Sequence, residues 1–538
     1  MIGRFSRKTA LEIAKQQLHK QRSNANRERK VPRMGKGPPI SFVGHRLSLD
    51  SLDHILEIGS SGGGKTLTLG PTFRTMVEAV NIDPTRKLLV LDTKGDATQA
   101  LEGMNVEYHL ITFSSQNGFA PDFAKDFSDF VSLVQLCRIL IPTTEGNNAF
   151  FRNAARGILL SETCTLHDVT KNAYGIDDIV NFATAEIDTI KAILARTEIG
   201  QRILNSFFTD EDDETLYKVR SELSSWLLPL MPTAAKCQVS ELLSVVDFWK
   251  GKTESSILVI KLSPDRLEAE RAAATALLQR SLEFIMGLTP PSDPKKLRKD
   301  KIIFIDDLNF YRRIPKFLEA TELIRGCGGL LVALSQSVEG LRSKNSYGDE
   351  ADALLANFAN ILMLRTSSPI TAKWFSDLFG KTHKARNSWG TNYGKEGSQG
   401  RVDQRQSTEN IVLDRDFLNM PPPSPEDGIT CYLKTQTFGE EIEKKIPWDQ
   451  IISRHAPKGS VDFFPLPPQL QIPAPWSDER RNFLCYGIVS EETDEAVADE
   501  SIFEDAMNDF VEEIRRVVFD LGFAAVERLI KPRTGKEK

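Results

Sequence analysis

The chain has 538 residues, a net charge of −6, and 40% hydrophobic and 26% charged residues, which is typical of a soluble globular protein and excludes a disordered or fibrous one. The length predicts about three to four domains. The six cysteines form no CxxC pair and no apolar run reaches 18 residues, so neither a disulfide framework, a zinc ribbon, a transmembrane helix nor a signal peptide is expected.

The small net charge hides two segments of opposite sign. Residues 1–38 carry 11 Lys and Arg against 2 Asp and Glu (11 − 2 = +9), whereas residues 491–513 carry 11 acids and no Lys or Arg (0 − 11 = −11). We interpret the first as a basic arm that contacts DNA or an anionic membrane surface, with a solvated tail as the alternative. The second binds basic partners or serves only to keep the chain soluble.

Apolar runs typical of buried strands recur along the chain, with helical patterns between them. This alternation predicts an α/β fold with a mostly parallel sheet that helices cover on both faces. From residue 113 to 256 the periodicity is helical, which indicates an inserted all-α domain. The predicted strands are Ile55–Ile58, Leu88–Leu91, Tyr108–Phe113, Ile257–Leu262, Ile302–Ile305, Leu330–Leu334, Ile361–Leu364 and Ile429–Leu433.

Four other segments do not fit the alternation of strands and helices. Asn387–Asn410 is rich in Gly, Ser and Gln and predicts a long flexible loop, and Phe463–Trp476 is Pro-rich and predicts an extended linker. Helical spacing recurs at Ala10–Leu18 and from Phe503 to Ala525. The predicted domains are 1–38, a basic arm; 39–122 with 253–460, the α/β domain; 123–252, the all-α insertion; 461–476, a linker; and 477–538, an acidic helical extension.

The string GSSGGGKT matches G-x-x-x-x-G-K-[ST] at every required position, after an apolar strand and before a helical pattern. Its glycines let backbone N–H groups turn toward one anion, and the helix N-terminus adds positive potential. Lys65 is expected to reach the β- and γ-phosphates and the Thr66 hydroxyl to bind Mg²⁺. The alternative is a Gly-rich structural turn. The predicted phosphate-binding residues are Gly59, Ser60, Ser61, Gly62, Gly63, Gly64, Lys65 and Thr66.

A second motif, KIIFIDD at residues 301–307, places acids directly after a buried strand. An acid at such a strand end, beside a phosphate loop, suits Mg²⁺ coordination, so Asp306 is the predicted magnesium ligand. Asp307 would then polarise the attacking water. On its own the pattern is weak, because an Asp that caps the next helix has the same appearance.

Four further residues follow or precede predicted strands. Gln336 ends the strand at 330–334 and would orient water or sense the γ-phosphate, unless it is a polar loop residue. Asp92 and Lys94 follow the strand at 88–91 and would lie at the same edge of the sheet as the phosphate loop. The alternative is that they belong to a solvated turn with Gly95 at positive φ. Arg325 lies at the end of a helix that leads into the strand ending at Gln336, where it either faces a neighbouring subunit or complements the dipole of its helix.

These ordered motifs resemble the type IV secretion and conjugation coupling proteins, the TraG/TraD family of hexameric ATPases. The match rests on GSSGGGKT, LLVLDTKGD, IIFIDDLNFYRRIPKFLEATELIRGCGGLLVALSQSVEGL, YGDEADALLANFANILMLRTSSPITAKWFSDLFGK and LDRDFLNMPPPSPEDGITCYLKT, over roughly residues 50–450. The resemblance implies a RecA-like P-loop ATPase domain that uses ATP and Mg²⁺. It also implies that Asp307 takes the place of a catalytic Glu, Gln336 that of a motif Gln, and Arg325 that of an arginine supplied in trans.

Two departures from the family stand out. Its members usually begin with two transmembrane helices, which are not evident here, so the resemblance implies a soluble variant or a separate membrane anchor protein. Asp307 is one methylene shorter than the usual Glu, which implies slow turnover.

The leading hypothesis is a homohexameric ATPase, cytoplasmic or peripheral at the inner membrane face. It would pass a relaxase-bound DNA strand, or a protein, to the channel components of a type IV secretion system. Lys395, Arg401 and Arg405 of the polar loop would contact phosphates, unless the loop is only surface. The alternatives are a nucleotide-gated substrate receptor with weak hydrolysis, or an FtsK- or HerA-like DNA pump outside secretion.

Overall fold

The computed structural model describes residues 37–142, 149–207, 213–293, 296–394, 397–437 and 441–487. They form two compact units. Unit 1 holds the described residues up to Tyr108, Glu254–Val259 and Leu282–Val461, and unit 2 holds His109–Thr253, Ile260–Ser281 and the described residues from Asp462 onward. The divisions fall inside one strand, β8 (Ile257–Lys261), and one helix, α13 (Leu267–Met286).

Unit 1 is built on a sheet with the strand order β15-β14-β11-β3-β10-β9-β4-β8. The pairs β11–β3, β3–β10, β10–β9 and β9–β4 are parallel, whereas β14 and β15 add an antiparallel edge. The predicted α/β fold with a mostly parallel sheet is therefore confirmed. The strands are β3 (Ile55–Ile58), β4 (Lys87–Asp92), β9 (Lys301–Ile305), β10 (Gly329–Ser335), β11 (Asn360–Met363), β14 (Ile429–Thr435) and β15 (Glu441–Ile446).

The central strands of unit 1 are mainly apolar because both of their faces are covered. Every residue of β3, β4 and β10 is buried, as expected for parallel strands between layers of helices. A small hairpin, β1 (Pro39–Phe42) and β2 (His45–Ser48), precedes them. The helices of unit 1 are α2 (Lys65–Ile82), α3 (Asp96–Gly103), α14 (Phe317–Leu323), α15 (Val338–Leu341), α16 (Ala351–Ala356), α17 (Pro369–Leu378), α18 (Asp414–Leu418) and α19 (Trp448–Arg454).

Unit 2 is mainly helical, and the segment predicted as an all-α insertion lies within it. Its long helix α6 contacts α5, α7, α9 and α10. It also contains three short strands, β5 (His109–Thr112), β6 (Ala120–Pro121) and β7 (Leu242–Leu243). The helices are α4 (Phe123–Asp126), α5 (Phe130–Leu140), α6 (Ala149–Thr170), α7 (Ile176–Thr184), α8 (Ile187–Leu194), α9 (Glu198–Phe207), α10 (Asp213–Leu227), α11 (Met231–Val239), α12 (Val245–Trp249) and α20 (Asp478–Tyr486).

The segment after residue 461 is held against unit 2 by polar contacts. Trp476 Nε1 donates to Asp178 Oδ1 at 2.7 Å, and Arg480 Nη2 donates to Asp178 Oδ2 at 2.6 Å. Arg196 Nη1 donates to the carbonyl oxygen of Phe483 at 2.7 Å. The described part of the predicted linker and extension is therefore bound to the helical unit.

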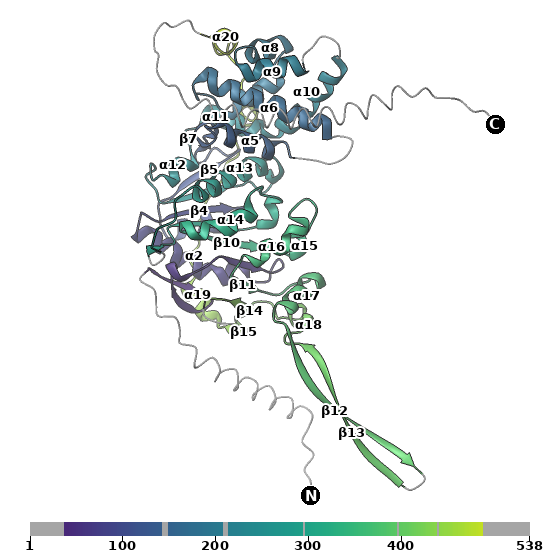
Figure 1. Ribbon diagram of the computed structural model, residues 1–538. Helices are drawn as coiled ribbons and strands as arrows, with labels where there is room; N and C mark the ends of the chain where they lie inside the picture. The colour runs from purple at the N-terminus through teal and green to yellow at the C-terminus, as the bar shows by residue number, and fades with distance from the viewer. Residues whose placement is uncertain are drawn as a thin grey trace, which may run out of the picture. The chain divides into compact units, whose positions relative to one another are not determined.

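The prediction of a flexible loop at Asn387–Asn410 is wrong. Strands β12 (Lys381–Gly394) and β13 (Gly397–Asn410) pair in one antiparallel register and form a hairpin. Figure 1 shows this hairpin projecting from the region of α17 and α18. The composition misled because a two-stranded ladder is held by backbone hydrogen bonds, which need no apolar run in the sequence.

Several predictions lie outside the described residues: the basic arm 1–38 up to residue 36, the helices at Ala10–Leu18 and Phe503–Ala525, the acidic segment 491–513, and Lys395. Within the described residues, no helix combines the length and the apolarity needed to cross a bilayer.

Candidate nucleotide site

The phosphate loop lies between β3 and α2 and is tied to the ends of two neighbouring strands. The Gly59 N–H donates to the carbonyl oxygen of Ser335 at 3.2 Å, and the Ser60 N–H donates to that of Arg365 at 3.0 Å. Ser60 Oγ also accepts from the Ser367 N–H at 2.9 Å. The shape of the loop is thus fixed by the ends of β10 and β11 on either side of β3.

Two glycines of the loop have a backbone that other residues rarely adopt. Gly62 has φ = 73° and Gly64 has φ = 99°, both in the left-handed region that favours glycine. A Cβ on Gly64 would also lie 2.7 Å from Pro423 Cγ, whereas one on Gly62 would meet no atom within 4 Å. The local backbone therefore favours glycine at Gly64, which the sequence motif requires, and at Gly62, a position that the motif leaves open.

Lys65 and Thr66 begin α2, where the N–H groups of a helix point outward. Lys65 Nζ donates to the carbonyl oxygens of Gly59 at 2.5 Å and Ser60 at 3.2 Å, and burial lowers its pKa. Thr66 Oγ1 donates to Asp96 Oδ2 at 3.3 Å. An ammonium and a hydroxyl are thereby presented at the mouth of the loop.

The two acids after β9 lie at the same edge of the sheet, and both are buried. Thr93 Oγ1 donates to Asp306 Oδ2 at 2.9 Å. Gln336 Nε2 donates to Asp307 Oδ2 at 2.6 Å, while Asp307 Oδ1 has no hydrogen-bond partner among the described residues. Gln336 itself is positioned by Asn309, whose Oδ1 accepts from the Gln336 N–H at 2.8 Å.

The electrostatics of this edge differ from those of exposed carboxylates. Burial, reinforced by the charge of Asp92 and opposed by that of Lys94, raises the pKa of Asp306 to about 6. Glu57 on β3 is fully buried, and neither of its carboxyl oxygens has a hydrogen-bond partner among the described residues. Burial raises the pKa of Glu57 well above its ordinary value, against the attraction of Lys65.

The turn after β4 is organised by a buried carboxylate. Asp92 is fully buried, its Oδ1 accepts from the Gly95 N–H at 2.6 Å, and its Oδ2 accepts from the Thr98 N–H at 2.9 Å. Gly95 has the expected positive φ, 91°, but the turn is not solvated at Asp92. Asp92 therefore shapes the turn, and the exposed Lys94 of the same turn is the residue left facing solvent.

Arg325 lies at the opposite edge of the sheet from the phosphate loop. It is exposed in a short helical turn, Ile324–Cys327, just before β10 begins. Burial, and then the charges of Lys299 and Arg325, lower the pKa of His54, at the start of β3, to about 3. The structure thus brings together Lys65, Thr66, Asp306, Asp307 and Gln336 but leaves Arg325 apart from them.

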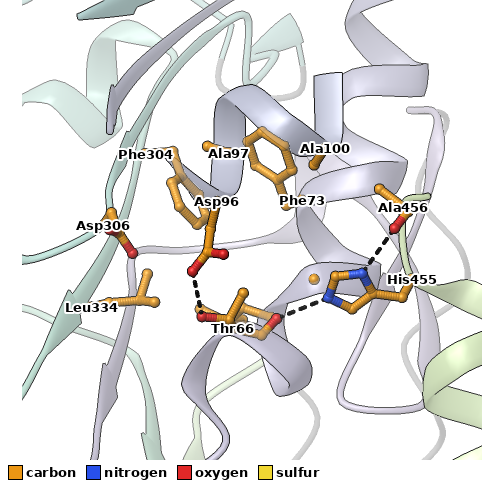
Figure 2. Close-up of a pocket in the computed structure, with 12 residues that line it drawn as sticks. Thr66, Phe73, Asp96, Ala97, Ala100, Phe304, Asp306, Leu334, His455 and Ala456 are labelled. Atoms are coloured by element: carbon orange, nitrogen blue, oxygen red, sulfur yellow. Dashed lines mark hydrogen bonds between the residues drawn. The ribbon is translucent and has the colours of Figure 1, made fainter. Parts of the chain in front are cut away.

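A pocket lies between α2 and α3 next to Thr66 and Asp306 (Figure 2). His455, which follows α19, closes one side of it: its Nε2 lies 3.2 Å from the Thr66 carbonyl oxygen and its Nδ1 3.0 Å from that of Ala456. Lys458 Nζ pairs with Asp96 Oδ1 at 3.0 Å. The segment after α19 therefore contacts the beginnings of both helices beside the phosphate loop.

Sequence reasoning missed several residues of this site. Thr93 donates to the carboxylate of Asp306, and Asn309 accepts from the backbone N–H of Gln336. Glu57 and His455 lie next to the phosphate loop. Thr93 lies inside the LDTKGD string and Asn309 follows the two acids, so proximity to a motif was their only signal. Glu57 carried a further signal, since it is an acid within an otherwise apolar strand next to the phosphate loop.

A glycine loop between a strand and a helix, with acids at the end of another parallel strand of the same sheet, defines a P-loop NTPase of RecA-like α/β fold. Residues 48–436 match the model of the type IV secretion-system coupling protein DNA-binding domain. The chain belongs to this family. No curated protein matches the chain.

Solved structures of a bacterial conjugative coupling protein, TrwB, have the same fold. The unbound TrwBdeltaN70 form has 18% identity and a TM-score of 0.59 over 83% of this chain and 93% of that one. The TrwB complex with ADP and Mg²⁺ has 17% identity and a TM-score of 0.57 over 84% and 95%. The TrwB complex with the ATP analogue ADPNP has 17% identity and a TM-score of 0.56 over 84% and 94%.

Proposed function

We propose that the chain hydrolyses ATP to recruit DNA, as a relaxase-bound and mostly single strand, and to move it into a type IV secretion channel. One observation carries the proposal: the ammonium of Lys65, the hydroxyl of Thr66 and the acids Asp306 and Asp307 meet at one edge of a parallel sheet. Membership in a family whose matched domain is described as DNA-binding supports DNA as the cargo.

The residues of the loop suit a nucleotide with Mg²⁺. Two glycines at positive φ leave room for backbone N–H groups to approach phosphate oxygens. Thr66 and Asp306 supply the hydroxyl and carboxylate oxygens that Mg²⁺ prefers. Asp307 adds a buried oxygen, Oδ1, that has no hydrogen-bond partner in the described part of the chain. When bound, MgATP supplies the phosphoryl group and a metal that neutralises its developing charge. TrwB has been solved with ADP and Mg²⁺.

Asp307 and Gln336 act as one unit in this proposal. Asp307 accepts the proton of the attacking water, because its Oδ1 is available while Oδ2 is held by Gln336. Gln336 holds the carboxylate in one orientation and responds to the γ-phosphate through the same amide. Because Asp307 is one methylene shorter than Glu, hydrolysis is slow.

Arg325 acts in trans, in a homohexamer, because it is exposed at the edge away from its own loop. Mixing Lys65→Ala and Arg325→Ala protomers tests this. If each site combines Lys65 of one subunit with Arg325 of the next, random mixing restores about a quarter of the wild-type rate. A mixture as inactive as its components would place Arg325 outside the trans role.

The partners follow from the same proposal: a relaxase, secretion-channel components and a membrane anchor protein, at the inner face of the cytoplasmic membrane. A nucleotide-gated receptor with weak hydrolysis is the second candidate, and the short Asp307 favours it. An FtsK- or HerA-like DNA pump differs from the proposed coupling ATPase only in lacking the secretion partners. A pull-down of relaxase by the full chain therefore distinguishes the coupling ATPase from such a pump.

The proposal is tested by the ATP hydrolysis rate of the full chain with and without single-stranded DNA, beside Lys65→Ala. We expect DNA to raise the wild-type rate and the variant to stay at background in both conditions. A wild-type rate that DNA leaves unchanged would remove the motor and favour the receptor.

A further inference from the structure

The turn that joins β4 to α3, residues 92–96, contacts both residues that are proposed to bind Mg²⁺. Thr93 Oγ1 donates to Asp306 Oδ2 at 2.9 Å, and Asp96 Oδ2 accepts from Thr66 Oγ1 at 3.3 Å. The two contacted residues belong to different elements, since Asp306 follows β9 and Thr66 lies in the first turn of α2. One short segment therefore supplies a hydrogen-bond partner to each of them.

A buried carboxylate fixes the backbone of this turn. Asp92 is fully buried and accepts from the N–H groups of Gly95 at 2.6 Å and of Thr98 at 2.9 Å. The side chain of Thr93 is buried as well, and Asp96 is the first residue of α3. The protein itself therefore holds Thr93 and Asp96 in place, through contacts in which no nucleotide takes part.

Both hydrogen bonds orient an oxygen without using up its capacity to bind a cation. A hydroxyl has one proton and two lone pairs, so a Thr66 hydroxyl that donates its proton to Asp96 keeps its lone pairs for a metal. Thr93 likewise takes up one lone pair of one carboxylate oxygen of Asp306. Figure 2 shows Thr66, Asp96 and Asp306 around the same pocket, with the bond between Thr66 and Asp96 dashed.

We infer that Thr93 and Asp96 are positioning residues of the magnesium site. Thr93 orients the carboxylate of Asp306, and Asp96 orients the hydroxyl of Thr66. This inference rests on the proposed function, because it concerns the Mg²⁺ that accompanies ATP there. Residues that hydrogen-bond to metal ligands change metal affinity by about 10- to 100-fold when they are replaced. A turn that served only the fold would affect nucleotide binding equally with and without Mg²⁺.

The test measures how nucleotide affinity depends on Mg²⁺, not the rate of hydrolysis. The full chain and its Thr93→Val and Asp96→Ala variants are titrated with a fluorescent ATP analogue, in EDTA and over a series of free Mg²⁺ concentrations. Thr93→Ser and Asp96→Asn are the conservative variants, because each keeps an oxygen that can make the same hydrogen bond. Lys458→Ala is the matched control, since it removes the ion pair at Asp96 Oδ1 and leaves the contact with Thr66 in place.

We expect Thr93→Val and Asp96→Ala each to raise the Mg²⁺ concentration needed for half of the full effect on binding by about 10-fold or more. The Kd in EDTA should stay at the wild-type value, because the phosphate loop is unchanged. The conservative variants should recover most of the Mg²⁺ response, and Lys458→Ala should match the wild type.

Two results would overturn the inference and leave the proposed function standing. One is a wild-type Mg²⁺ response in both Thr93→Val and Asp96→Ala. The other is a loss of affinity that is as large in EDTA as in Mg²⁺, which would give the turn a structural role only. A wild-type chain that binds no ATP analogue at any Mg²⁺ concentration would overturn both the inference and the proposed function.

Discussion

Gln336 offers a local test of whether its side chain orients the carboxylate of Asp307 for hydrolysis. Its amide donates to Asp307 at 2.6 Å, while its backbone N–H is held by Asn309, so Gln336→Ala removes the side-chain contact but keeps the loop in place. A hydrogen bond to a charged group contributes about 1.5–3 kcal/mol. Because Gln336 is exposed, we expect about 1–2 kcal/mol, which is a 5- to 30-fold loss in kcat.

The assay is steady-state ATP hydrolysis, with binding of a fluorescent ATP analogue as the control measurement. Gln336→Ala should lower kcat and leave the analogue Kd unchanged, since the contact concerns the acid and not the phosphate loop. Gln336→Glu should lower kcat further, because it places a second carboxylate against Asp307. A kcat equal to wild type in both variants would refute the view that Gln336 orients Asp307.

The remaining predictions concern stability and the loop. Glu57→Gln should raise the urea midpoint by an amount that grows with pH. Burial raises the pKa of Glu57 in the folded state, so the stability that its carboxyl contributes is fully present below about pH 4.5 and is lost as the pH rises through the folded-state pKa. An equal gain in the urea midpoint at pH 5 and at pH 8 would contradict this. Arg480→Ala should cost about 2–3 kcal/mol, because Asp178 then stays buried without its ion pair, with faster proteolysis after residue 461 as the readout. Gly64→Ala should weaken nucleotide binding more than Gly62→Ala. Both substitutions place a side chain on a backbone with positive φ, but only a Cβ at position 64 would contact the ring of Pro423. Equal losses of affinity would count against the contact with Pro423.

The α/β layout was predictable because each parallel strand is mainly apolar. The predicted Ile55–Ile58 coincides with β3, and Ile257–Leu262 differs from β8 by one residue. The strand ends were equally readable, since polar residues follow β9 and β10 directly. The P-loop could be recognised because glycine at Gly62 and Gly64 answers a backbone constraint that is local to the loop.

What the sequence could not supply depends on contacts between distant segments. Thr93 meets Asp306 across 213 positions of the chain, and His455 meets Thr66 across 389. The hairpin β12–β13 was missed because backbone pairing, not side-chain pattern, holds its strands together.

The central claim is that ATP hydrolysis at the P-loop moves DNA. The most direct measurement is displacement of streptavidin from the end of a biotinylated single strand by the full chain, with ATP or with a non-hydrolysable analogue. The account predicts displacement with ATP and Mg²⁺, none with the analogue, and none by Lys65→Ala. Hydrolysis of ATP in the presence of bound DNA without any displacement would contradict it.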